Sequence, residues 1–154
     1  MPERLFNVSV DMEEDISMYL SNERRGLEDG FPRLLDLFRS SGVVADLFVQ
    51  GELVTTLEDP LREAVRRGHR LGLHGSRHRG SWRRPTVDPD GLAQAADLLR
   101  EYAGRPPATH RAPNFRLRER DVPVLERLGL RVDSSILPGL RFVRARGTLL
   151  LFDE

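Results

Sequence analysis

The stretch "FPRLLDLFRSSGVVADLFV" (31–49) contains two hydrophobic patterns in succession. In its first part, leucine and phenylalanine recur at helical spacing, and Gly42 follows as a typical helix end. The second part, "VVADLFV" (43–49), is a short apolar run rich in β-branched and aromatic residues, which predicts a buried strand. A helix followed directly by a buried strand is the repeating unit of an α/β fold.

The same alternation continues on both sides of this stretch. The predicted strands are 5–10, 43–49, 70–74, 109–115, 130–138 and 147–154, and the predicted helices are 31–41, 60–68, 89–104 and 120–129. Such an order indicates a mostly parallel sheet with helices packed on it. The fold is therefore either an open α/β sheet or a (β/α) barrel. In both architectures, functional groups gather at the carboxyl ends of the strands.

Length and composition limit the classes of function. The chain has 154 residues, which predicts a single domain over 1–154. It contains no cysteine, so any metal ion must be held by histidine and carboxylate side chains. All 24 basic residues are arginine, which excludes a lysine nucleophile. The formal net charge is zero, which removes the usual electrostatic case for nucleic acid as a partner.

No targeting or membrane signal is visible in the sequence. The N-terminal "MPERLFNVSVDMEED" (1–15) has no signal-peptide pattern of basic residues, apolar stretch and small-residue cleavage site. No apolar run reaches the 18 or so residues that a membrane-spanning helix needs. We therefore expect a cytoplasmic protein without a membrane span.

Candidate functional residues cluster at the ends of the predicted strands. These residues are Asp11 and Glu13, His74 and His78, Arg111, and Asp133. Because the carboxyl ends of parallel strands meet at one edge of the sheet, the four clusters could face a common cleft.

Each of these residues also has an ordinary structural interpretation. An aspartate that ends a strand is commonly a turn or helix cap. The pair His74 and His78 could lie in a solvated loop, yet two imidazoles and a carboxylate are also a common ligand set for zinc or another divalent ion. Arg111 is more consistent with a carboxylate partner than with a plain surface charge. For the other two histidines, His69 and His110, we expect packing or structural roles.

Together these segments resemble the polysaccharide deacetylase family, the NodB-homology domain of carbohydrate esterase family 4. Four family motifs occur in order, and they are "SVDMEED" (9–15), "HGSRH" (74–78), "RAPNF" (111–115) and "DSSILP" (133–138). The first is most similar to a variant subgroup that has Asp-Val-Glu-Asp in place of Asp-Asp-Gly. The resemblance covers about residues 5–138 and implies a distorted, incomplete (β/α) barrel.

The resemblance implies a metal centre. His74 and His78 match the two metal-binding histidines of the family. The third ligand is normally the second acidic residue of the first motif, which gives Glu13 here, with Glu14 and Asp15 in reserve. The ion implied is divalent, with zinc first and cobalt, manganese or nickel as alternatives.

The resemblance also implies catalytic roles. Asp11 matches the catalytic base, Arg111 matches the arginine that orients this base, and Asp133 matches the polar residue of the fourth motif. The activity implied is metal-dependent hydrolysis of a carbon–nitrogen amide bond, which removes acetyl groups from an N-acetylated polysaccharide or oligosaccharide.

The chain departs from the family pattern at its C-terminal end. The family takes its general acid from a histidine in a fifth motif, and this sequence has no histidine after His110. The chain is also short for the family, so the last strands of the barrel are expected to be missing. Three explanations stay open: a truncated fragment, a barrel completed by a second copy of the chain, or a non-catalytic carbohydrate-binding relative. A small amide or ureide is the alternative substrate.

Overall fold

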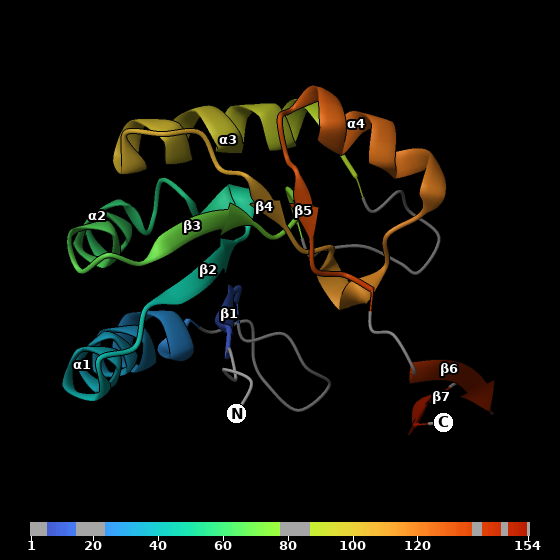
Figure 1. Cartoon of the computed structure of the whole chain (residues 1–154), viewed down its shortest axis with the longest axis horizontal. Helices are drawn as coiled ribbons and strands as arrows, with labels where there is room; N and C mark the ends of the chain where they lie inside the picture. The colour runs from blue at the N-terminus through green and yellow to red at the C-terminus, as the bar shows by residue number, and fades with distance from the viewer. Residues whose placement is uncertain (1–5, 15–23, 78–86, 137–139, 146–147, 154) are drawn as a thin grey trace, which may run out of the picture.

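The computed structural model describes residues 6–14, 24–77, 87–136, 140–145 and 148–153, the last two ranges as backbone (Figure 1). Five strands form one parallel sheet in the order in which they occur in the chain. They are β1 (Val8–Met12), β2 (Ala45–Val49), β3 (Arg70–Leu73), β4 (Thr109–His110) and β5 (Val132–Asp133). The predicted parallel α/β sheet is confirmed.

Four helices connect these strands and lie along one side of the curved sheet (Figure 1). They are α1 (Phe31–Ser41), α2 (Glu58–Arg66), α3 (Pro89–Ala103) and α4 (Val122–Arg127). The first and third end where the sequence predicts, at Gly42 and Gly104, and both glycines adopt the left-handed conformation, with φ of 66° and 67°. None of the helices in the described ranges is long and apolar enough to cross a membrane.

A π-helical turn, η1 (Gly26–Gly30), precedes α1 and was not predicted. Pro32 stands in the first turn of α1 and has no N–H group, so it cannot donate the usual hydrogen bond to the residue four positions earlier. The N–H of Phe31 instead donates to the carbonyl of Gly26, five positions earlier. The wider turn is consistent with the missing donor.

The two faces of the sheet have different environments. The core between sheet and helices contains strand residues of alternating position, such as Met12, Leu47 and Leu73, together with apolar side chains of the helices. Successive side chains on a strand point to opposite faces. The residues between these positions, including Asp11 and Phe48, therefore lie on the face away from the helices. This second face holds Asp11, Arg111 and most of the other polar side chains described below.

The predicted strand boundaries differ most from the structure at β1, β4 and β5. β1 runs to Met12, because its last residues pair with β2, and Asp11 therefore lies within the strand opposite Phe48. β4 and β5 have only two residues each, far fewer than predicted. Three 3-10 turns occupy nearby loops: η2 (Gly51–Leu53), η3 (Pro113–Phe115) and η4 (Glu119–Asp121).

The last described segments form a separate antiparallel pair of strands, β6 (Leu140–Ala145) and β7 (Thr148–Asp153). A strand near 147–154 was predicted and is confirmed, but its partner β6 was not. The sequence of β6, "LRFVRA", places an arginine at its second and fifth positions, and this spacing breaks the simple alternation that marks a strand.

Candidate active site

Four residues at the ends of β2 to β5 stand at one level across the sheet. They are Gln50, His74, Arg111 and Ser134, called here the strand-end row. The backbone N–H of each donates to a carbonyl oxygen of the preceding strand at 2.8–3.0 Å, which continues the parallel ladder by one step. Strand alternation places their side chains on the face away from the helices, as it does for Asp11 and Phe48.

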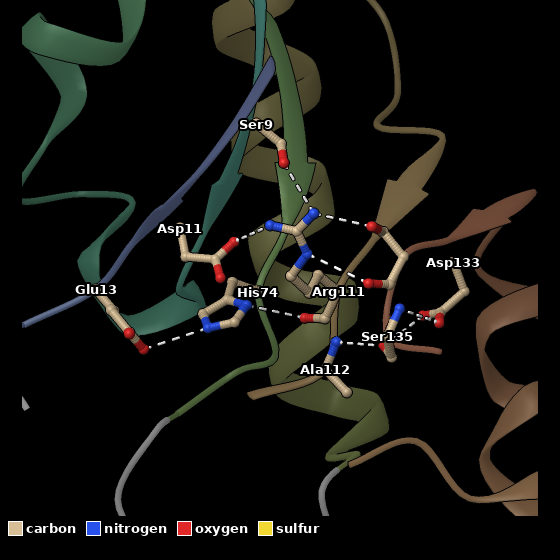
Figure 2. Close-up of polar contacts among 9 residues, drawn as sticks. Ser9, Asp11, Glu13, His74, Arg111, Ala112, Asp133 and Ser135 are labelled. Atoms are coloured by element: carbon tan, nitrogen blue, oxygen red, sulfur yellow. Dashed lines mark hydrogen bonds and ion pairs between the residues drawn. The ribbon is translucent and has the colours of Figure 1, made fainter. Parts of the chain in front are cut away.

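Arg111 connects β4 to β1 through its guanidinium group (Figure 2). Its Nη1 donates to Asp11 Oδ1 at 2.7 Å, and its Nη2 donates to the hydroxyl oxygens of Ser9 at 2.9 Å and Ser134 at 2.8 Å. Its Nε donates to the carbonyl oxygen of Ser134 at 3.3 Å. With every donor nitrogen engaged, the guanidinium is held in one orientation. The predicted carboxylate partner of Arg111 is confirmed.

The Arg111 guanidinium also stacks on an aromatic ring, with its Cζ atom 4.3 Å from the centroid of Phe48. Gly72, the residue of β3 opposite Phe48, leaves room for this arrangement. A Cβ atom at position 72 would lie 3.0 Å from the Phe48 ring and would overlap Thr109 Oγ1. The absence of a side chain at Gly72 is therefore a condition for the position of Arg111.

Glu13 and His74 meet beside Asp11 and Arg111, although Glu13 follows β1 and His74 follows β3 (Figure 2). His74 is buried, and its Nδ1 lies 3.0 Å from the carbonyl oxygen of Arg111. A carbonyl can only accept a hydrogen bond, so Nδ1 carries the proton and donates. In the neutral imidazole, Nε2 is then an acceptor, and it lies 3.2 Å from Glu13 Oε2.

Two acceptors at this distance repel each other unless a proton or a metal ion lies between them. Two ligand atoms each about 2 Å from one tetrahedral ion lie about 3.3 Å apart. A histidine whose second ring nitrogen donates to a backbone carbonyl is the usual arrangement for a metal ligand. Glu13 and His74 therefore fit a divalent ion in both chemistry and spacing.

The remaining residues of the expected metal centre are only partly described. His78 and Asp15 lie outside the described residues. Glu14 is buried and accepts from Nε and Nη2 of Arg24 at 3.2 and 3.0 Å, so an arginine already neutralises this reserve carboxylate. Within the described ranges, no group of three or more histidine, aspartate or glutamate side chains could hold a metal ion.

Asp133 does not join Asp11 and Arg111, contrary to the expectation of one common cleft. It pairs in register with His110, and His110 Nδ1 lies 2.7 Å from Asp133 Oδ2. The alternation of β4 places His110 on the opposite face from Arg111. The expectation of a common cleft did not take into account that a one-residue difference in register reverses the face to which a side chain points.

Ser135 completes a small polar network with this pair. Its N–H and hydroxyl donate to the two carboxylate oxygens of Asp133 at 2.8 and 3.0 Å, and its hydroxyl oxygen accepts from the Ala112 N–H at 2.7 Å. Burial alone would raise the pKa of the Asp133 carboxyl, but the hydrogen bonds from His110 and Ser135 outweigh it and hold that pKa below its usual value. An ionised Asp133 thus ties the ends of β4 and β5 together.

His69 has the packing role that the sequence predicts. It is buried, its ring lies 5.5 Å from that of Phe38, and its Nδ1 accepts from the Ala45 N–H at 3.1 Å. Burial, helped by the positive charge of Arg67, lowers the pKa of the His69 imidazole. Both contacts suit a neutral ring that stabilises the start of β2.

Gln50 was missed in the sequence. It follows β2 as His74 follows β3, and it is fully buried. The signal that could have found it is its position one residue beyond a buried strand, the same position that singled out His74. A neutral amide neither titrates nor is among the common zinc ligands, so the residue type alone does not indicate acid–base or metal chemistry.

Comparison with known proteins identifies the family to which the chain belongs. It belongs to the polysaccharide deacetylase family, whose sequence profile matches residues 15–132. A peptidoglycan deacetylase of Helicobacter pylori is 28% identical over 131 residues, which is 82% of this chain and 42% of that protein. The chain thus spans less than half the length of this relative.

Solved structures confirm the predicted fold class. A protein of Mycobacterium smegmatis described as a polysaccharide deacetylase superimposes with a TM-score of 0.69 at 21% identity, over 94% of this chain and 56% of that one. A CE4 family pseudoenzyme of Bacillus anthracis gives a TM-score of 0.61 at 14% identity, over 82% of this chain and 41% of that one. The five-stranded sheet thus corresponds to part of the distorted (β/α) barrel of these structures.

Proposed function

We propose that this chain carries the active site of a metal-dependent hydrolase that removes N-acetyl groups from a polysaccharide or oligosaccharide. The observation that carries the proposal is the placement of two pairs side by side at the strand ends: Asp11 with Arg111, and Glu13 with His74. Membership of the polysaccharide deacetylase family and similarity to a protein named peptidoglycan deacetylase support the substrate class.

Glu13 and His74 would hold the ion, with His78 as the third ligand by analogy with the family. Zinc suits imidazole and carboxylate donors, and cobalt, manganese and nickel are the alternatives. Such an ion supplies a hydroxide nucleophile near neutral pH and polarises the acyl oxygen. The carbonyl of Arg111, which accepts from His74 Nδ1, would keep the imidazole in the tautomer that binds metal.

Asp11 is the described group best placed to act as general base. Its side chain is one-quarter exposed, so a substrate or water molecule can reach it. Arg111 occupies Oδ1, which leaves Oδ2 to take a proton from the attacking water.

The leaving amine needs a proton, and two described histidines are not placed to give it. Both are buried. His69 lies at the amino end of the sheet, beside the start of β2, and His110 lies on the helix side of the sheet, beside Asp133. Asp11 carries a proton after the attack, and we propose that it returns this proton to the leaving nitrogen. One carboxylate would then act first as base and afterwards as acid.

A carbohydrate-binding role without turnover is the second candidate. A pseudoenzyme shares the fold, so the fold itself does not guarantee catalysis. The loop after β4 offers a surface for sugar in either case. Phe115 in this loop is 37% exposed, has a left-handed φ of 54°, and its ring centroid lies 5.8 Å from Arg111 Cζ. An exposed ring beside the proposed base could stack on a sugar.

The deciding experiment measures acetate release from an N-acetylglucosamine oligomer by the zinc-loaded chain, together with binding of the oligomer. We expect slow, zinc-dependent release that falls about 10²–10⁴-fold in Asp11→Asn. Asp46→Asn is the matched control, because Asp46 lies in the same sheet but pairs with Arg70 at its other end. Oligomer binding with no release in wild type would instead establish the binding role, and equal release by Asp11→Asn would remove Asp11 as base.

A further inference from the structure

Gln50 is a fully buried side chain whose amide is only half satisfied. Its Nε2 donates to Glu52 Oε1 at 2.5 Å, while its Oε1 has no hydrogen-bond partner in the described part of the chain. A carboxylate accepts hydrogen bonds and does not donate them, so the amide nitrogen must be the atom that faces Glu52. The unpaired atom is therefore the oxygen, an acceptor.

The strand-end row fixes the place of Gln50 in the sheet and the face on which its side chain lies. Gln50 has an extended backbone (φ −66°, ψ 128°), so the alternation of β2 continues through it and places its side chain on the same face as Phe48. Glu13 follows β1 and His74 follows β3, the two strands on either side of β2. Their contact at 3.2 Å therefore spans β2 at the level of Gln50.

Three residues with acceptor atoms thus stand at neighbouring strand ends on one face of the sheet: Glu13 with Oε2, His74 with Nε2 and Gln50 with Oε1. Buried polar atoms almost always have a partner, so an unpaired acceptor in this position needs an explanation. A divalent cation supplies one, because it attracts all three atoms. Side-chain amide oxygens are known ligands of divalent ions, and they also accept hydrogen bonds from waters bound to such ions.

We propose that Gln50 is a further member of the cation site that Glu13 and His74 form, with its Oε1 facing the ion directly or through one of the ion's water molecules. This inference rests on the metal centre of the proposed function and adds to it a residue outside the four family motifs. Glu52 would then orient the Gln50 amide, by accepting from its Nε2, so that Gln50 Oε1 faces the site.

A purely structural role for Gln50 makes a different prediction. If the amide only tethers Glu52, its loss would change the stability of the metal-free chain and leave cation affinity unaltered. The two roles are therefore separated by measuring cation binding and stability on the same variants. Glu52 also lies 3.7 Å from Arg77, so its own position does not depend on Gln50 alone.

The experiment titrates the metal-free chain with Co²⁺ alone and follows visible absorption and the unfolding midpoint. Gln50→Leu is expected to weaken Co²⁺ binding about 10–100-fold, as removal of a supporting group around a metal site typically does. Gln50→Glu, which adds a negative charge at the same point, is expected to bind Co²⁺ more tightly while its metal-free form unfolds at lower temperature beside Glu52. Gln94→Leu makes the same chemical change at an exposed glutamine of α3 and should leave binding unchanged.

The possible results distinguish the role of Gln50 from the existence of the metal centre itself. If wild type binds Co²⁺ and Gln50→Leu binds it equally well, this inference fails and the metal centre stands. If wild type binds no Co²⁺, the metal centre fails and the inference falls with it. If Gln50→Leu does not fold, the test relies on Gln50→Glu. A Co²⁺ affinity of Gln50→Glu equal to or weaker than that of wild type would overturn the role proposed for Gln50.

Discussion

The two halves of the sheet are held together in different ways. β1, β2 and β3 are joined by continuous ladders of five and four residue pairs. β4 and β5 share only two pairs, and β3 meets β4 through one. In this second half, the side chains of His110, Asp133, Ser135 and Arg111 supply contacts that backbone pairing supplies in the first.

Two carboxylates illustrate the difference, because each pairs in register with a basic residue on a neighbouring parallel strand. Asp46 pairs with Arg70 across β2 and β3, and Asp133 pairs with His110 across β4 and β5. Arg70 is half exposed and can be solvated without its partner, whereas His110 is completely buried. The same kind of pair should therefore matter more in the half with short strands.

The largest effect is expected from Arg111, which joins the two halves. Arg111→Met would remove its bonds to Asp11, Ser9 and Ser134 while keeping an apolar stem on Phe48. We expect the free energy of unfolding to fall by about 2–4 kcal/mol, because a largely buried ion pair loses one partner. Denaturant unfolding measures this change, and acetate release should be lost in parallel.

Arg70→Met is the matched control for this substitution. It also breaks an arginine–carboxylate pair, but between strands that a ladder already holds. A loss of stability as large as that of Arg111→Met would contradict the distinction between the two halves.

The next effect concerns the two matched carboxylates. Asp133→Asn should lower the free energy of unfolding by about 1–3 kcal/mol, because it weakens bonds to a histidine that water cannot reach. Asp46→Asn should cost about 1 kcal/mol or less, as is usual for a pair with one exposed partner. Chemical denaturation of the two variants under the same conditions gives the comparison.

A double-mutant cycle makes this prediction sharper. If His110 and Asp133 act as one unit, His110→Leu with Asp133→Leu should be less destabilised than the sum of the two single variants. Additive losses would mean that the hydrogen bond at 2.7 Å contributes little to stability.

The sequence-based predictions were more accurate for the part of the chain that forms β1 to β3 than for the part that forms β4 and β5. α1 was predicted to the residue, because its apolar spacing and Gly42 are local signals. His74 was correctly placed at a strand end, and Glu13 lies against it. Asp133 was expected to share a cleft with the other strand-end residues, but it lies beside His110 instead. A two-residue strand leaves no alternating pattern from which to read its orientation.

The third prediction tests the close packing at the junction of the two halves, where β3 meets β4. Gly72→Ala should lower the free energy of unfolding by about 1–2 kcal/mol, because the added methyl group would overlap Thr109 and press on Phe48. It should also displace Arg111, which rests on the Phe48 ring, and so reduce acetate release. Gly42→Ala is a useful contrast, since nothing lies within 4 Å of a Cβ atom there and the cost comes from its left-handed φ alone. Loss of stability in Gly72→Ala without loss of activity would show that Arg111 does not depend on this packing.

The smallest effect is expected from His69, which contacts the amino end of β2. Backbone pairing with β1 and β3 already stabilises this strand, so one side chain adds little. Burial lowers the pKa of His69 in the folded chain, so the unfolded chain binds the proton more readily. The contribution of the neutral ring is complete above the unfolded pKa of about 6.5 and is lost as the pH falls through the lower folded value. His69→Asn keeps an acceptor for the Ala45 N–H and removes the titrating ring. The stability difference between wild type and this variant should therefore shrink from pH 7.5 to pH 5, measured by denaturant unfolding at each pH. A constant difference would mean that His69 stays neutral, or protonates equally well, in both states.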